Sequence, residues 1–193
     1  NLCLCKFFAV GDNLAASNIL SRSSCFTFSV PNFLTEYLAS ANSKKSIFIF
    51  LSDKGFYDAI ECAEKPIVLS HSNARGVCKH VRNASDDMLK KLADNGGITG
   101  INCAKIFLND DKKKGEKTIQ CMLEHILYIK RKIGVEHIAL GTDFDGIDTD
   151  IELEDASKTP LLITALENAK FTADEIDCIT HKNALRVLKE NLK

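Results

Sequence analysis

The sequence predicts an α/β protein in which helices cover a parallel sheet. Three short apolar segments, at residues 67–70, 98–102 and 137–143, alternate with longer segments that have a helical period. Strands that are apolar throughout are typical of a sheet buried on both faces, and alternation with helices favours parallel pairing. A doubly wound sheet and a (β/α)8 barrel both fit this order. In either fold, the polar residues that end the strands gather at one edge, where sites form.

Helix signals separate the three strands. Ser52 and Ser85 each precede a segment with an apolar stripe, so we expect each side chain to cap a helix. Apolar residues recur at i, i+3, i+4 and i+7 between Ile119 and Ile133, and Gly134 is a natural stop. The predicted helices cover residues 53–63, 86–95, 119–133 and, as two or three segments, 157–192. Apart from a short apolar segment at residues 48–50, residues 1–50 show no clear period and stay unassigned.

Composition excludes several classes of protein. The chain has 25 basic and 26 acidic residues and no tryptophan, so it lacks the charge and the stacking platforms of a nucleic-acid binder. No apolar run approaches the roughly 20 residues of a membrane span. The eight cysteines form no CxxC pair, and most of those beyond position 50 lie in apolar runs. This pattern favours free thiols in a reducing compartment, and we expect a cytoplasmic protein.

The ends of the first and third strands carry the candidate site residues. His71 lies in "SHS", where an imidazole either binds metal or satisfies a backbone carbonyl. Asp143 lies in "GTDFDG", where a carboxylate acts as general base or metal ligand, or caps the following turn. Arg75 and Arg82 follow His71 in a loop. Such arginines are solvated or paired, or they bind a substrate carboxylate through both guanidinium branches.

Spacing alone assembles no complete metal site. The chain contains no HxH, HxD or HExxH pair. The acidic run from Asp143 to Asp155 does not have the register of a calcium loop, because Ile147 and Asp148 fall where an acid and a glycine are required. We expect the other histidines to be structural or exposed; they are His80, His125, His137 and His181.

Four motifs in order resemble the zinc-dependent membrane-dipeptidase (renal dipeptidase) family of metallopeptidases. They are "PIVLSHSNAR", "RN" at 82–83, "GTDFDG" at 141–146 and "LEDASKTP" at 153–160. The resemblance runs from about Leu51 to the C-terminus. It implies a (β/α)8 TIM barrel with a binuclear zinc site, in which residues 51–193 are the C-terminal half of the barrel.

The resemblance also implies roles for three residues. In the family, a water or hydroxide between two zinc ions attacks the peptide carbonyl of a dipeptide. By position in the motifs, His71 corresponds to a zinc ligand, Arg82 to the residue that binds the substrate's C-terminal carboxylate, and Asp143 to the proton shuttle. Zinc lowers the pKa of bound water toward about 7, which makes this chemistry coherent. The implied partner is a dipeptide, and a homodimer is expected because family members often dimerise.

Three parts of the family pattern are missing. The N-terminal His-x-Asp and the glutamate that bridges the metals cannot be located, and Phe50 lies where a further zinc-binding histidine is expected. Only His71 remains of the expected ligands, whereas zinc sites typically use three or four. We therefore expect a truncated form that is inactive by itself. Two alternatives stay open: a non-catalytic remnant or interaction module, and another metal-dependent barrel hydrolase completed by a partner chain.

Overall fold

Three parallel strands form the sheet at the centre of the protein. The computed structural model describes residues 52–110, 117–144, 146–147 and 151–192. The strands are β1 (Val68–Leu69), β2 (Ile98–Ile101) and β3 (Ile138–Leu140), and they lie in the order β1-β2-β3 with both pairs parallel. Thr99 of β2 lies beside Leu69 on one side and Ile138 on the other. The predicted α/β class and the parallel pairing are therefore confirmed.

The two helices expected after Ser52 and Ser85 begin where the sequence predicts. The Ser52 hydroxyl accepts a hydrogen bond from the Gly55 N–H at 3.3 Å, and the Ser85 hydroxyl accepts one from the Met88 N–H at 3.2 Å, so both predicted caps are present. The helices are α2 (Asp53–Cys62), α3 (Asp86–Asp94), α4 (Lys105–Leu108), α5 (Thr118–Ile133), α6 (Thr159–Asn168), α7 (Ala173–Asp177) and α8 (Asn183–Asn191). A π-helical segment, Cys178–Lys182, joins α7 to α8.

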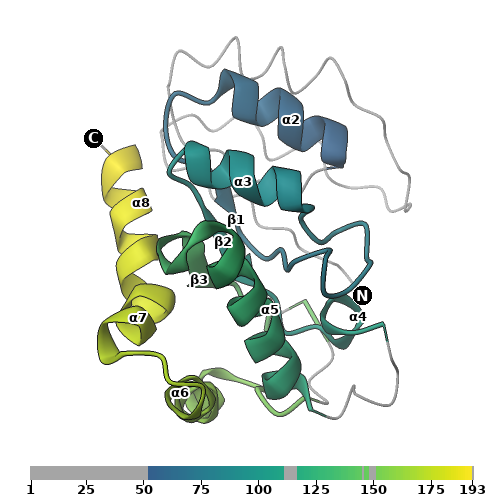
Figure 1. Cartoon of the computed structure of the whole chain (residues 1–193), viewed down its shortest axis with the longest axis vertical. Coiled ribbons are helices and arrows are strands. Elements are labelled where there is room, and N and C mark those ends of the chain that lie inside the picture. The colour runs from purple at the N-terminus through teal and green to yellow at the C-terminus, as the bar shows by residue number, and fades with distance from the viewer. Residues whose placement is uncertain (1–51, 111–116, 145, 148–150, 193) are drawn as a thin grey trace, which may run out of the picture.

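The two faces of the sheet pack against different helices. Leu69, Ile101 and Ile138 belong to the main core, together with buried residues of α2, α3, α5 and α6. Val68, Ile98 and Ala139 form a second, smaller cluster with Val187 of α8. In Figure 1, α3 and α5 lie in front of the strands, and α8, in yellow, lies to one side of them. The sheet is thus buried on both faces, as its apolar strands predict.

Helix α8 fixes the segments that lead into all three strands. Asn183 donates two hydrogen bonds of 2.8 Å to carbonyls around the start of β3. Arg186 donates one of 2.8 Å to the carbonyl of Gly96, just before β2, and Asn191 donates one of 3.0 Å to the carbonyl of Pro66, just before β1. The helix therefore crosses the amino ends of the strands in the order β3, β2, β1, and it holds them in register.

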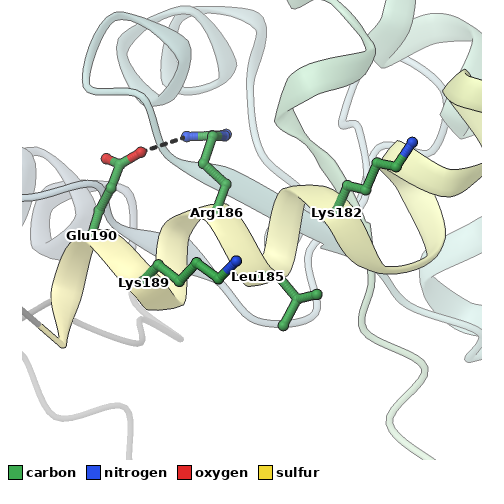
Figure 2. Close-up of a pocket in the computed structure, with 5 residues that line it drawn as sticks. All are labelled: Lys182, Leu185, Arg186, Lys189 and Glu190. Carbon is green, nitrogen blue, oxygen red and sulfur yellow. Dashed lines mark ion pairs between the residues drawn. The ribbon is translucent and has the colours of Figure 1, made fainter.

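A shallow surface hollow lies along this same helix. It has a volume of about 400 Å³ and is lined by Lys182, Leu185, Arg186, Lys189 and Glu190 (Figure 2). Arg186 and Glu190 form an ion pair of 3.7 Å across it. Because α8 crosses the amino ends of the strands, the hollow is far from the polar residues that follow their carboxyl ends. We assign the candidate site to the carboxyl ends, where parallel sheets place their chemistry.

Replacing Asn183 with alanine tests how much α8 contributes to stability. The change removes two hydrogen bonds from a buried side chain to backbone carbonyls, which costs about 2 kcal/mol of the free energy of unfolding. Chemical denaturation measures this loss. Lys189→Ala, at an exposed position of the same helix, is the control and should change stability by less than about 0.5 kcal/mol. Equal losses in both variants would contradict the role given to Asn183.

Candidate active site

Two glycines let the carboxyl ends of the strands meet closely. A Cβ on Gly100, in β2, or on Gly141, just after β3, would collide with the carbonyl oxygen of Ser70, just after β1. Only glycine permits this approach of the backbones. As a result, His71, Asn102 and Asp143 leave the sheet at the same edge, and the structure brings together the two strand-end residues that the sequence singles out.

His71 is held as a neutral imidazole between two neighbours. Its Nδ1 lies 2.7 Å from the Ser70 hydroxyl oxygen and its Nε2 lies 3.3 Å from Nη2 of Arg82. Because a guanidinium only donates, Nε2 is the acceptor and Nδ1 carries the proton. Burial has the largest effect and lowers the pKa of His71; the Asp143 carboxylate raises it and the Arg82 charge lowers it. A neutral ring with a lone pair on Nε2 is the form that binds metal.

Arg82 lies against an aromatic ring at the same edge. Its guanidinium carbon is 4.5 Å from the centroid of Phe107, and its backbone carbonyl accepts a 3.0 Å hydrogen bond from Ser72. The ring of His80 packs edge-on against Phe107 at 4.7 Å, and His80 Nδ1 accepts from the Arg82 N–H at 3.2 Å. These contacts fix the plane of a partly buried guanidinium beside His71.

Arg75 has a structural role. Its guanidinium donates to both carboxylate oxygens of Asp53, at 2.7 and 2.6 Å, and this hydrogen bond lowers the pKa of Asp53. It also donates to the carbonyls of Val81 and Asn83, at 2.9 Å each. The side chain thus ties the loop after β1 to the first turn of α2. Of the two loop arginines that the sequence offers, Arg82 lies beside His71.

Asp143 combines the two roles that the sequence leaves open. Its backbone has a φ of 63°, in the left-handed region, and its carbonyl accepts a 2.9 Å hydrogen bond from the Gly146 N–H, so it forms part of a turn. Its side chain is partly exposed and its Oδ2 accepts a 3.3 Å hydrogen bond from Nδ2 of Asn102. A carboxylate in this position is available for chemistry as well as for turn structure.

Sequence reasoning missed a pair of buried asparagines beneath the site. The amide of Asn73 donates to the Asn102 carbonyl at 3.1 Å, and the Asn102 N–H donates to Oδ1 of Asn73 at 2.9 Å. Both side chains are fully buried. The signal was present, because Asn102 directly follows β2, as His71 follows the end of β1. Asparagine is common in turns, however, and it carries no charge, so the sequence alone gives no reason to assign Asn102 to a site.

The other histidines have structural or surface positions, as predicted. His125 is fully buried between the Ala74 N–H, at 3.1 Å, and the Leu108 carbonyl, at 3.0 Å. Burial lowers the pKa of His125 to about 4, so this ring is neutral. His137 lies 2.7 Å from the Gly97 carbonyl, and His181 is exposed. Phe50, which replaces an expected histidine, lies outside the described residues.

The donors at this edge suit zinc in kind but not in number. His71 offers a nitrogen and Asp143 an oxygen, both of which zinc accepts. Cys103 is close enough for the Asp143 charge to act on it, but burial is the main reason that its pKa rises to about 12, which keeps the thiol protonated. No group of three or more His, Cys, Asp or Glu side chains that could hold a metal occurs within the described part of the chain.

The fold and this edge define an α/β protein whose polar groups gather at the carboxyl ends of parallel strands. Residues 50–193 match the membrane dipeptidase family (peptidase family M19), and the chain belongs to that family. This confirms the resemblance inferred from the four motifs. Within the described residues, no helix combines the length and apolarity that crossing a membrane requires.

Proteins from other organisms align with most of this chain. It is 36% identical over 140 residues to an uncharacterized protein encoded in the pqqA 5′ region of Klebsiella pneumoniae, and 34% identical over 141 residues to the dipeptidase tcpJ of Claviceps purpurea. Each alignment covers 72% of this chain, but 52% of the first relative and 33% of the second. The chain therefore spans about half or less of these proteins.

A solved structure also matches most of this chain while this chain covers less than half of it. A metallopeptidase from Rhodobacter sphaeroides, whose crystal structure holds a phosphinate mimic of the dipeptide L-Ala-D-Ala, superposes with a TM-score of 0.66 at 28% sequence identity. The match covers 72% of this chain and 40% of that one.

Titration of His71 tests whether the three side chains converge. Asp143→Asn removes a carboxylate that stabilises the imidazolium, so the pKa of His71 falls further. Arg82→Gln removes a cation that opposes protonation, so the pKa rises. The imidazole C2–H resonance in NMR measures both shifts, with His181 as an internal control. A His71 pKa that neither substitution moves would show that these groups do not share one edge in solution.

Proposed function

We propose that this chain belongs to a zinc-dependent dipeptidase that hydrolyses the peptide bond of dipeptides. In this proposal, residues 51–193 form the C-terminal half of a (β/α)8 barrel. The observation that carries the proposal is the convergence of His71, Arg82 and Asp143 at one edge of the parallel sheet. His71 Nε2 is 3.3 Å from Arg82 Nη2, and the charge of Asp143 reaches the same ring. Membership of the dipeptidase family supports this assignment.

Arg82 is proposed to bind the free carboxylate of the substrate. A guanidinium keeps its charge at all physiological pH values and donates two parallel hydrogen bonds to a carboxylate. The Phe107 ring, 4.5 Å from the guanidinium carbon, holds the plane of this fork. A dipeptide has its C-terminal carboxylate one residue from the scissile bond. A cation fixed beside the reacting edge therefore selects short peptides whose carboxylate is free.

Asp143 is proposed to move the proton. A carboxylate at the open edge can accept a proton from the attacking water and return it to the leaving amine. Such a group must be held at one place, and Asp143 is held by its turn and by Asn102. His71 is proposed to contribute one zinc ligand through Nε2, whose lone pair becomes available when Arg82 Nη2 leaves it to bind the substrate carboxylate. Bound zinc would supply an acidified water and a polarised carbonyl.

We further propose that the 193-residue polypeptide is inactive by itself and represents a truncated form. The reason is the number of ligands: His71 is one imidazole, and zinc sites typically use three or four protein ligands. The sequence contains no His-x-Asp, and Phe50 lies where another histidine is expected. The same departures favour a second candidate, a remnant that serves as an interaction module without catalysis. A third candidate is a hydrolase in which a partner chain supplies the missing zinc ligands.

The cellular compartment of the protein is also part of the proposal. Within the described residues, Cys78 and Cys103 are buried free thiols. Free buried thiols are typical of a reducing compartment, so we place the protein in the cytoplasm. A homodimer stays a prediction.

Zinc content and turnover together separate these candidates. The purified chain is incubated with zinc, freed of excess metal, and assayed for bound zinc and for dipeptide hydrolysis. We expect fewer than one bound zinc ion per chain and no hydrolysis of the dipeptide. About two zinc ions per chain with turnover would show that this polypeptide is itself the enzyme, and Asp143→Asn should then lower kcat at least about 100-fold. Lys189→Ala, on the far side of the sheet, is the control.

Recognition of the carboxylate can be measured without metal. A dipeptide with a free C-terminus is expected to shift the side-chain N–H resonances of Arg82 in NMR, whereas the same dipeptide as its C-terminal amide is not. Arg82→Gln should remove the response because the fork of donors is lost. Arg75, which is paired with Asp53, serves as the internal control resonance. An equal response to both peptides would count against the dipeptidase assignment.

A further inference from the structure

The Asp143 carboxylate has two chemically distinct oxygens in this structure. Oδ2 accepts the hydrogen bond from Asn102 at 3.3 Å, whereas Oδ1 lies beside Gly146. We propose that Asn102 is a positioning residue for Asp143, and that Oδ1 is the oxygen that exchanges the proton. This inference rests on the proposed function, because it concerns the working atom of the proposed proton shuttle.

The direction of the Asn102 amide is fixed by its own surroundings. Its Oδ1 accepts a 2.7 Å hydrogen bond from the Ala104 N–H, at the start of α4. The NH2 group must therefore point the other way, toward Asp143. A flipped amide would place oxygen against the carboxylate and NH2 against an N–H donor, and both contacts are repulsive. Asn102 can thus bind one carboxylate oxygen and is not free to turn away.

Asn102 is anchored to the rest of the site through Asn73. The two asparagines exchange reciprocal hydrogen bonds of 3.1 and 2.9 Å, and neither side chain is exposed. Asn73 also donates to the Phe107 carbonyl at 3.3 Å, and Asn83 donates to the same carbonyl at 2.9 Å. Because the Phe107 ring lies against Arg82, this buried network links the proposed carboxylate-binding cation to the carrier of the proton.

Only glycine at position 146 fits beside the second oxygen. A Cβ at this position would lie 2.6 Å from Oδ1 of Asp143, which is closer than a carbon and an oxygen approach without a bond. The Gly146 N–H is already bound to the Asp143 carbonyl at 2.9 Å, so the two residues cannot easily separate. Asn102 therefore occupies one oxygen, and glycine at position 146 places no side chain against the other.

The orientation of Asp143 can be measured directly by NMR. Three-bond couplings between its Hα and Hβ protons report χ1, and wild type should show one dominant staggered rotamer. In Asn102→Ala the couplings should average over several rotamers, because the donor to Oδ2 is gone. Asn83→Ala is the matched control: it removes a buried asparagine with two backbone hydrogen bonds and leaves Asn102 in place. A single unchanged rotamer in Asn102→Ala would overturn the proposal.

Two further variants keep the test decisive if Asn102→Ala does not fold. Gly146 is exposed, so Gly146→Ala should fold, and it should displace Asp143 from its wild-type rotamer. Asp143→Asn should shift the side-chain NH2 resonances of Asn102, and Asn tolerates the left-handed backbone of this position. Absence of both effects would also overturn the proposal. None of these measurements needs zinc or turnover, so failure of the dipeptidase assignment is detected separately.

Discussion

The contact between the Ser70 carbonyl and two glycine backbones is the constraint on which the site depends. Gly100 and Gly141 have no Cβ, and this lets the carboxyl ends of three strands meet. The residues that follow the strands are thereby brought within the range of hydrogen bonds and of charge. A side chain at either glycine would push the strands apart and break the 3.3 Å contact between Asn102 and Asp143. The chemistry of this edge is thus a consequence of backbone packing in the sheet.

Sequence predicts most of the local structure and little of the tertiary arrangement. The caps at Ser52 and Ser85 and the three parallel strands follow from local patterns and are present. β1 is shorter than predicted. β3 also ends earlier than predicted, at Leu140, because the turn that carries Asp143 begins soon after it. The short helix α4 has no side-chain cap and no long apolar stripe, so it leaves no clear signal. The path of α8 across the strand starts depends on contacts between distant segments, which a local pattern does not encode.

The three candidate site residues could be predicted from the sequence, whereas the residues that hold them in place could not. His71, Arg82 and Asp143 are found because they match spaced family motifs, and the structure places them together. Their proposed roles still rest on the family. Asn102 and Phe107 act through hydrogen bonds and ring contacts that exist only after folding, so neither stands out in the sequence. Residue chemistry alone leaves Arg75 and Arg82 equivalent; the family motif selects Arg82, and the ion pair with Asp53 shows that Arg75 has a structural role.

Helix α8 has a consequence for the order in which the protein is made. It lies at residues 183–191, more than 40 residues after the last of the three strands, and yet it holds the segments before β1, β2 and β3. During synthesis the N-terminal parts of a chain emerge first, and each unit folds when its contacts are available. The three strands are translated well before the helix that aligns them. A nascent chain therefore exposes an unfastened sheet until α8 has left the ribosome, so the strands are aligned stably only after residues 183–191 have been made.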